Sequence, residues 1–286
     1  MTGGVSGALF LAFATLVDPG DEVIMGDPFF VIYHHAVKFF GGVPVHADTY
    51  PDFRLSAERI EPHITKRTKI IILGNPANPT GATLNKHELT AIARLAKKHD
   101  LLVISDEIYS VFNYESIPPS MASLSEDVLL VSGFSKSHAA PGWRIGYAFG
   151  PSDIIDEMSK LQQYSFVCAP SPAQAAIIEN LELDTTSVTD EYRRKRDLIC
   201  GGLSDRFEFA KPGGAFYLFP EAPWGTGDEF VEEAIRNNLL VIPGSIFSDR
   251  NTHFRISYAA SDETIRKGID ILNQLADSPR EPDHKA

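Results

Sequence analysis

Lys136 and Arg144 form the part of the chain whose residue types and spacing best suit chemistry. Lys136 follows an apolar run at residues 128–131 and a Gly/Ser-rich stretch at residues 132–135, which includes Ser135. The run is typical of a buried strand, so the lysine is expected just beyond a strand end, among small residues that leave room for a cofactor. The planar guanidinium of Arg144 can donate two parallel hydrogen bonds to a phosphate. Taken alone, the pair is equally compatible with a surface lysine and a structural arginine.

Polar residues follow three apolar runs of the chain, at residues 69–73, 101–104 and 128–131. Apolar strands separated by helices or long crossings predict a parallel sheet covered on both faces. Because ligands of such sheets bind outside the carboxyl ends of the strands, the polar residues are expected to converge there. Those residues are Asn78, Asp106, Tyr109 and Lys136.

The remaining pattern predicts an α/β fold with a mostly parallel sheet of seven strands flanked by helices, and a smaller α+β C-terminal domain. We expect a large domain at residues 1–185, a small domain at 186–278 and a disordered polar tail at 279–286. Expected strands lie at residues 22–25, 43–46, 207–210, 215–219, 239–242 and 254–257, and expected helices at 86–98, 151–164, 170–181, 186–203, 227–237 and 261–276.

The N-terminal stretch is Gly-rich and runs directly into an apolar helical pattern at residues 8–17. Free backbone N–H groups at a helix start bind anions, and a flexible leader is an equally good interpretation at this point. No Lys or Arg precedes Lys38, so a signal peptide is not favoured, and the run is too short to span a bilayer. A buried helix is therefore expected, with no membrane association.

The composition is that of an ordinary soluble globular protein. The 286 residues carry a formal net charge of −12, which argues against a general nucleic-acid or anionic-membrane surface. Any bound anion must therefore be held by a local pocket. Cys168 and Cys200 provide neither a disulfide framework nor zinc-ligand spacing, so we expect no metal and a cytoplasmic location.

Four motifs, taken together and in this order, give the chain a family resemblance. They are Asn75-Pro-Ala-Asn78-Pro-Thr-Gly81, Ser105-Asp106-Glu-Ile-Tyr109, Ser135-Lys136 with Gly142-Trp-Arg144-Ile-Gly146, and Phe254-Arg255-Ile-Ser257-Tyr258. From Thr2 to about Ala276, the chain resembles the class I/II aminotransferases that depend on pyridoxal phosphate and share the aspartate aminotransferase fold.

The resemblance implies a catalytic role for the residues at the strand ends. Lys136 would attach pyridoxal 5'-phosphate and then move a proton from the substrate α-carbon. Asp106 would pair with the protonated pyridine nitrogen, which keeps the ring electron-poor. Tyr109 and Asn78 would hydrogen-bond the ring hydroxyl oxygen. Asn78 would also help bind the substrate.

Further residues would hold the cofactor and the substrate. The resemblance implies that Phe30 stacks on the ring, with Phe29 as an alternative, and that Arg255 clamps the substrate α-carboxylate. Phe216, with Tyr217 beside it, would line the substrate pocket, although core packing is an equal alternative. The phosphate would be held by Arg144, Ser135 and the backbone around Gly4, Val5 and Ser6.

The implied activity is ping-pong transfer of an amino group from an L-amino acid to a 2-oxo acid, in a homodimer. The alternatives are a carbon–sulfur β-lyase of the same fold and a shortened remnant that binds pyridoxal phosphate without turnover, because relatives begin well before the phosphate-binding glycines. Ser6 stands where some bacterial aspartate-specific relatives carry a lysine. Neutral and aromatic donors are therefore expected at least as readily as aspartate.

Overall fold

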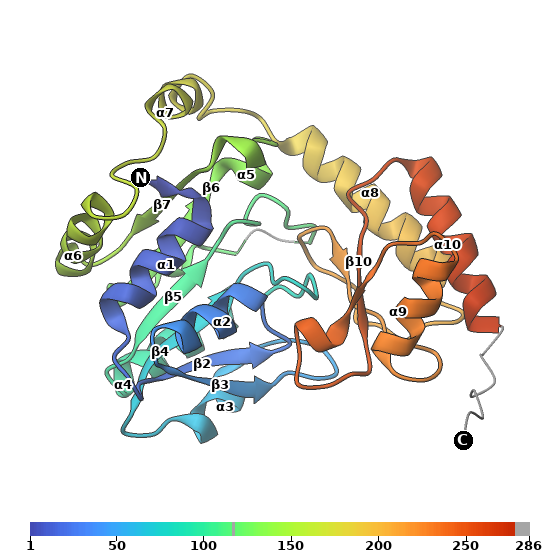
Figure 1. Ribbon diagram of the computed structural model, residues 1–286, viewed down its shortest axis with the longest axis horizontal. Coiled ribbons are helices and arrows are strands. Elements are labelled where there is room, and N and C mark those ends of the chain that lie inside the picture. Colours follow the sequence, from blue (N-terminus) through green and yellow to red (C-terminus); the bar gives the residue numbers. More distant parts are fainter. Residues whose placement is uncertain (116–117, 278–286) are drawn as a thin grey trace.

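A seven-stranded sheet forms the centre of the molecule in the computed structural model, which describes residues 1–115 and 118–277 (Figure 1). The strand order is β1-β7-β6-β5-β4-β2-β3. The pairs β2–β3, β2–β4, β4–β5 and β5–β6 are parallel, whereas β7 is antiparallel to β6 and to β1. This mostly parallel sheet confirms the predicted fold class. Its strands are β1 (Thr2–Gly3), β2 (Glu22–Asp27), β3 (Val43–Asp48), β4 (Thr68–Gly74), β5 (Leu102–Asp106), β6 (Val128–Gly133) and β7 (Ile145–Phe149).

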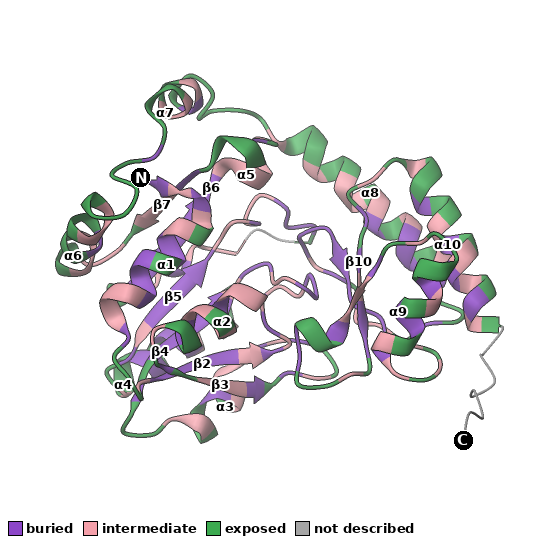
Figure 2. Cartoon of the chain, viewed as in Figure 1, coloured by how far each residue is buried: buried purple, intermediate pink, exposed green. Residues whose placement is uncertain are grey.

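Helices cover both faces of this sheet, as expected for strands that are apolar throughout. On one face α1 (Gly4–Leu16), α2 (Val31–Phe39) and α6 (Ser152–Gln163) pack against apolar side chains of β2, β4, β5 and β6. The other face is covered by α3 (Ala57–Ile60) and α4 (Lys86–Lys98). The sheet is therefore the most buried layer, as Figure 2 shows.

Helix α1 confirms the prediction of a buried helix near the N-terminus. Leu9, Leu11 and Phe13 are almost fully inaccessible, so the apolar run is part of the core. No helix of residues 1–115 and 118–277 is long and apolar enough to cross a membrane.

The C-terminal elements form a second, smaller arrangement beside the carboxyl ends of the parallel strands (Figure 1). A three-stranded antiparallel sheet has the order β8-β10-β9 and consists of β8 (Tyr217–Leu218), β9 (Ile242–Pro243) and β10 (Phe254–Ser257). The helices here are α8 (Thr186–Leu203), α9 (Gly227–Arg236) and α10 (Asp262–Asp277), preceded by α5 (Phe134–Ser137) and α7 (Ser171–Ile178).

One predicted strand is wrong, one is shorter than expected and one is displaced along the chain. Residues 207–210 form neither helix nor strand, because Phe207 packs among the helices instead of pairing in a ladder. Strand β8 keeps only two residues of the range 215–219, and β9 shares only Ile242 with the strand predicted at 239–242. Tyr109 and Phe112 pack in one cluster with Leu203 and Phe230, so one core joins the two parts. The division at residue 185 stays a prediction, and the tail at 279–286 lies outside the described residues.

Candidate active site

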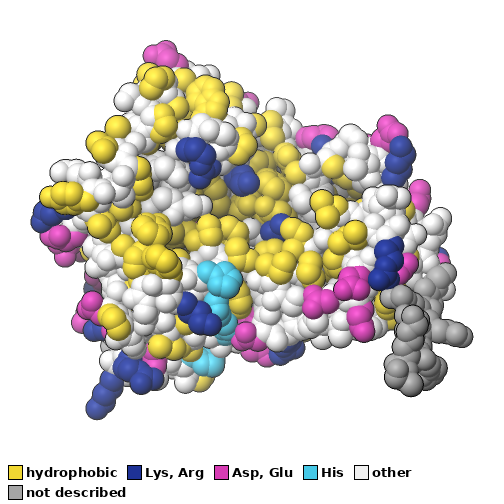
Figure 3. All heavy atoms as spheres, in the orientation of Figure 1, with side chains coloured by type: hydrophobic (Ala, Val, Ile, Leu, Met, Phe, Trp, Pro, Cys, Tyr) yellow, Lys and Arg dark blue, Asp and Glu magenta, His cyan; other side chains and the backbone are white. Residues whose placement is uncertain are grey.

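A cavity of about 320 Å³ lies at the carboxyl ends of the parallel strands, against the C-terminal part. In Figure 3, lysine or arginine side chains lie in the hollowed middle of one face, surrounded by hydrophobic ones. The residues that line the cavity are Val5, Ser6, Phe30, Tyr33, Gly74, Pro76, Asn78, Asp106, Ile108, Tyr109, Ser135, Lys136, Pro141, Arg144, Tyr217 and Arg255.

Lys136 reaches this cavity from α5, the short helix that directly follows β6. Its Nζ lies 5.7 Å from the ring centre of Tyr109 and 5.5 Å from that of Phe216. Burial lowers the pKa of the ammonium, and the positive charges of Arg255 and Arg144 lower it further. Lys136 therefore becomes a neutral amine more readily than an exposed lysine would.

Asp106 is the last residue of β5 and is almost fully buried. One carboxylate oxygen accepts a hydrogen bond from the Tyr33 hydroxyl at 2.8 Å, and the other accepts from the Ile108 backbone N–H at 3.1 Å. Burial raises the pKa of Asp106 to about 6, although both hydrogen bonds act in the opposite direction. A carboxylate in this state gains strongly from a cationic partner.

Tyr33 was missed at the sequence level. It lies on α2, one helical turn after Phe30, and both side chains line the cavity. The signal was this three-residue aromatic spacing at the start of a helix.

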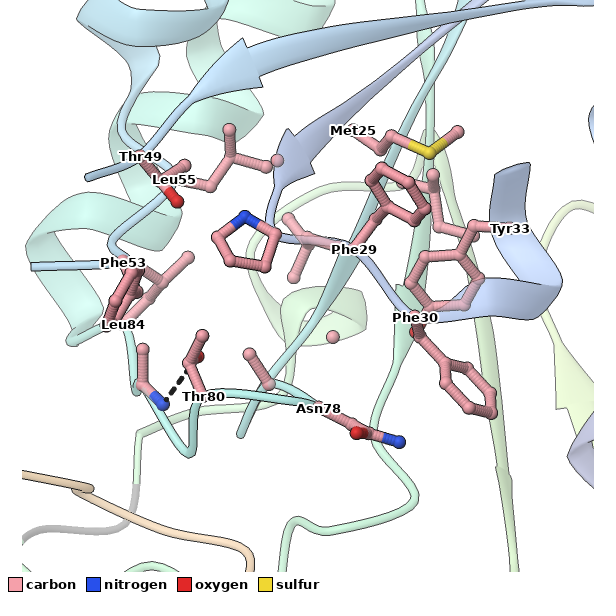
Figure 4. A pocket seen from close by; sticks show the side chains of 17 residues that line it. Met25, Phe29, Phe30, Tyr33, Thr49, Phe53, Leu55, Asn78, Thr80 and Leu84 are labelled. Carbon is pink, nitrogen blue, oxygen red and sulfur yellow. Dashed lines mark hydrogen bonds between the residues drawn. The ribbon is translucent and has the colours of Figure 1, made fainter. Parts of the chain in front are cut away.

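The structure also separates the two adjacent phenylalanines. Phe30 lines the cavity, whereas Phe29 stacks on the rings of His34 and His46. Figure 4 shows a neighbouring hollow of about 40 Å³, in which Phe29 points toward Met25 while Phe30 points away, to the side of Asn78. Of the two alternatives, Phe30 is therefore the one available to a ligand of the cavity.

The N-terminus of α1 and Arg144 contribute neighbouring parts of the cavity wall. Helix α1 begins without a side-chain cap and without an acidic residue in its first turn, so its backbone N–H groups favour an anion. Gly4 has a φ of 72°, and a Cβ there would lie 2.5 Å from Nη2 of Arg144. The guanidinium donates to the carbonyl of Pro141 at 2.9 Å and to that of Gly3 at 3.3 Å. Residues 2–16 form β1 and α1, so the interpretation as a flexible leader is wrong, whereas anion binding at this helix start stays a prediction.

Arg255 approaches the cavity from β10 and is half-buried. Its Nη1 donates to Oδ1 of Asn78 at 2.9 Å, and its Cζ lies 4.6 Å from the ring centres of Tyr217 and Phe247. Burial lowers the pKa of the guanidinium. Its Nε is buried and has no hydrogen-bond partner among the described residues. An unpaired donor of this kind is costly unless a ligand satisfies it.

Tyr109 completes the wall between the two ends. Its hydroxyl lies 2.8 Å from that of Tyr217, and burial raises its pKa far above the ordinary range. Tyr109 therefore stays protonated and can donate a hydrogen bond.

The structure brings together most of the residues that the sequence predicted. Gly4 and Phe216 are not among the cavity-lining residues: Gly4 lies behind Arg144, and the Phe216 ring packs against Tyr109 and Phe112. Within residues 1–115 and 118–277, no group of three or more His, Cys, Asp or Glu side chains is arranged to hold a metal ion. The individual roles stay predictions.

Comparison with known proteins gives consistent results. The family model described as aminotransferase class I and II matches residues 1–272. The aspartate/prephenate aminotransferase of Thermus thermophilus is 38% identical over 282 residues, which cover 94% of this chain and 73% of that protein. The aromatic-amino-acid aminotransferase 2 of Thermococcus litoralis is 35% identical over 292 residues, covering 96% and 75%. The crystal structure of the aromatic aminotransferase from Pyrococcus horikoshii superposes with a TM-score of 0.93 at 34% identity, over 96% of this chain and 78% of that one.

Proposed function

The chain belongs to the class I and II aminotransferase family, and we propose that it uses pyridoxal 5'-phosphate to move an amino group between an L-amino acid and a 2-oxo acid. The observation that carries this proposal is that one cavity joins a desolvated lysine, a buried carboxylate and two separately held arginines. The lysine would attach the cofactor, and the carboxylate would pair with the nitrogen of the cofactor ring. The two arginines would bind the cofactor phosphate and the substrate carboxylate.

The residues of the cavity fit such a cofactor. The uncapped start of α1, with Gly4 packed against Arg144, is suited to a phosphate, and Val5, Ser6 and Ser135 line the same end. Asp106, which burial holds close to protonation, would be stabilised by a protonated pyridine nitrogen. Phe30 provides an aromatic face, and Tyr109 a hydroxyl donor.

The same residues can bind the substrate and move the proton in an amino transfer. When bound, pyridoxal phosphate supplies an electron sink for the electrons released at the substrate α-carbon. Lys136, as a neutral amine, accepts the proton from that carbon and returns a proton in the opposite half-reaction. Arg255 and Asn78 hold the α-carboxylate, which turns the α-C–H bond toward Lys136. The two half-reactions share one site, as a ping-pong sequence requires.

We further propose that neutral and aromatic amino acids are donors at least as good as aspartate. Lys136, Arg144 and Arg255 are the only Lys, Arg or His side chains among those that line the cavity, and each already has a proposed role. Around them the wall includes Phe30, Ile108 and Tyr217. Initial rates with aspartate that far exceed those with every neutral and aromatic donor would overturn this proposal.

A cytoplasmic homodimer is the remaining part of the proposal. Tyr164, Val167 and Ile178, on and between α6 and α7, are mostly exposed and apolar, which suits a partner surface. A sedimentation experiment that finds only monomers at micromolar concentration would contradict the dimer.

The visible absorbance of the purified protein with pyridoxal phosphate tests the function. We expect a protein-bound cofactor band that bleaches when a donor amino acid is added and returns when a 2-oxo acid follows. Circular dichroism serves as the control for folding. A folded chain without any bound-cofactor band would contradict the proposal. Release of ammonia from a cystathionine substrate without a 2-oxo acid would instead indicate a β-lyase.

A further inference from the structure

We propose that Phe247 is a positioning residue that holds Arg255 in the orientation required for the substrate α-carboxylate. This inference rests on the proposed function, because it assigns Arg255 to that carboxylate. Phe247 does not line the cavity, and no sequence motif singled it out. Its ring centre nevertheless lies 4.6 Å from Cζ of Arg255. A guanidinium at this distance from an aromatic face is attracted by the ring, and more strongly when water is excluded.

Phe247 is itself firmly fixed. The side chain is 3% exposed and packs in one cluster with Phe53 and Phe219. Its backbone carbonyl accepts a hydrogen bond of 2.7 Å from the N–H of Phe29, and its own N–H donates to Gly244 at 2.7 Å. The ring is therefore a rigid surface rather than one that adapts to its neighbour.

The residues that follow Phe247 tie the same loop to the ends of the parallel strands. Ser248 hydrogen-bonds the Tyr50 hydroxyl at 2.9 Å, and Asp249 contacts His46 at 2.6 Å. Phe29, whose N–H is bonded to Phe247, directly precedes the cavity-lining Phe30. The arginine on β10 and the proposed cofactor-stacking ring of Phe30, at the start of α2, therefore share one support.

Arg255 needs this support because few other contacts hold it. Its Nη1 donates a hydrogen bond to Asn78, and its Nε has no hydrogen-bond partner among the described residues. An arginine side chain has several rotatable bonds, and fixing them costs conformational entropy that a rigid neighbour reduces. The Tyr217 ring also lies 4.6 Å from Cζ, but its hydroxyl is engaged with Tyr109. The Phe247 ring, unlike that of Tyr217, contacts Arg255 without also carrying a hydrogen-bonding group.

The test compares Phe247→Leu with Phe219→Leu in the full chain loaded with pyridoxal phosphate. Phe219 is 1% exposed and lies in the same cluster, so its replacement controls for lost packing. The probes are L-phenylalanine, which carries the α-carboxylate, and 2-phenylethylamine, which lacks it. We expect Phe247→Leu to raise the KM for L-phenylalanine about tenfold, with less effect on kcat, and to leave the response to 2-phenylethylamine unchanged. Phe247→Tyr, which keeps the ring, should restore the parent KM.

The outcomes distinguish the positioning role of Phe247 from the proposed function of the chain. Equal KM increases in Phe247→Leu and Phe219→Leu, or equal losses for both probes, would overturn the positioning role. So would a parent-like KM in Phe247→Leu. If that variant does not fold, Phe247→Met replaces it as the aliphatic variant and the same comparison decides. A parent protein that binds the cofactor but responds to no amino acid would overturn the proposed function, and this inference with it.

Discussion

The two arginines of the cavity are held in contrasting ways. Arg144 is exposed, has a left-handed backbone with a φ of 55°, and is held by nearby backbone carbonyls beside the start of α1. Arg255 is half-buried and is held by side chains: the amide of Asn78 and the rings of Tyr217 and Phe247. Backbone groups thus hold one of the two proposed anion-binding arginines, and partly buried side chains hold the other.

This difference suits two kinds of anion. A group that stays bound through many turnovers benefits from backbone donors that need no rearrangement. A partly buried guanidinium distinguishes substrates with a carboxylate from those without one. A ligand that lacks the carboxylate leaves the guanidinium donors unsatisfied, which costs free energy. The contrast therefore agrees with a phosphate at Arg144 and a substrate carboxylate at Arg255.

Removing the amine on which both arginines act should have the largest effect. Lys136→Ala is expected to lower the transamination rate by at least about 10³-fold, because the proton acceptor is lost. The free energy of unfolding should hardly change, since the side chain is not part of the core. Single-turnover kinetics measure the loss, with the exposed Lys160→Ala as the control. A variant that retains the parent rate would show that Lys136 is not the base.

Arg255→Met should come next and should separate the two ends. We expect kcat/KM for amino acids to fall about 10²-fold, because a buried charged hydrogen bond to the carboxylate is lost, with the affinity for pyridoxal phosphate retained. Arg250→Met is a matched control, because Arg250 also lies on an aromatic ring, that of Tyr50, but not in the cavity. If Arg255→Met lost as much affinity for pyridoxal phosphate as Arg144→Met, the assignment of the two arginines to different anions would be wrong.

Arg144→Met should show the opposite pattern at a smaller scale. We expect about a tenfold weaker affinity for pyridoxal phosphate, because backbone donors of α1 remain in place. At saturating cofactor the KM for the amino acid should be close to the parent value. Fluorescence titration of the cofactor and steady-state kinetics together test this. A raised KM with unchanged cofactor affinity would exchange the roles of the two arginines.

The pH dependence should distinguish the arginines most finely. Both positive charges lower the pKa of Lys136, and that of Arg255 contributes more. Removing either charge makes the protonated lysine less unfavourable, so its pKa rises and the neutral amine forms only at higher pH. The acidic limb of the cofactor-attachment rate should therefore move to higher pH, further in Arg255→Met than in Arg144→Met. Stopped-flow absorbance across pH measures this, and a shift toward lower pH would refute the cause.

The sequence alone was sufficient to predict the parallel strands of the sheet and the polar residues at their carboxyl ends. Strands β4, β5 and β6 are continuous apolar runs bounded by polar residues, and this pattern also locates Asn78, Asp106 and Lys136. Strand β7 was not predicted. It runs antiparallel beside β6 and begins directly after the turn of Arg144.

The contacts that support the site were harder to predict. The Tyr33 hydroxyl bonds an Asp106 that is distant in sequence, and the Phe247 ring lies beside Arg255 across the irregular loop at residues 248–253. No helix or strand spacing predicts either contact. Of the C-terminal strands, β10 has the predicted bounds of 254–257, whereas β8 and β9 differ from their predicted bounds. Two of them contain only two residues, which is too short for an alternating pattern to appear.

The hydrogen bond between Asn78 and Arg255 joins two residues that are synthesised at different times. Asp106, Lys136 and Arg144 lie within the first 144 of the 286 residues, whereas Phe247 and Arg255 leave the ribosome much later. Because domains of a nascent chain tend to fold from the N-terminus, the parallel strands can pair before the substrate arginine exists. A cofactor that binds at this stage would stabilise the early sheet by mass action. The supply of pyridoxal phosphate during translation, and not only during turnover, would then influence how much native protein a cell accumulates.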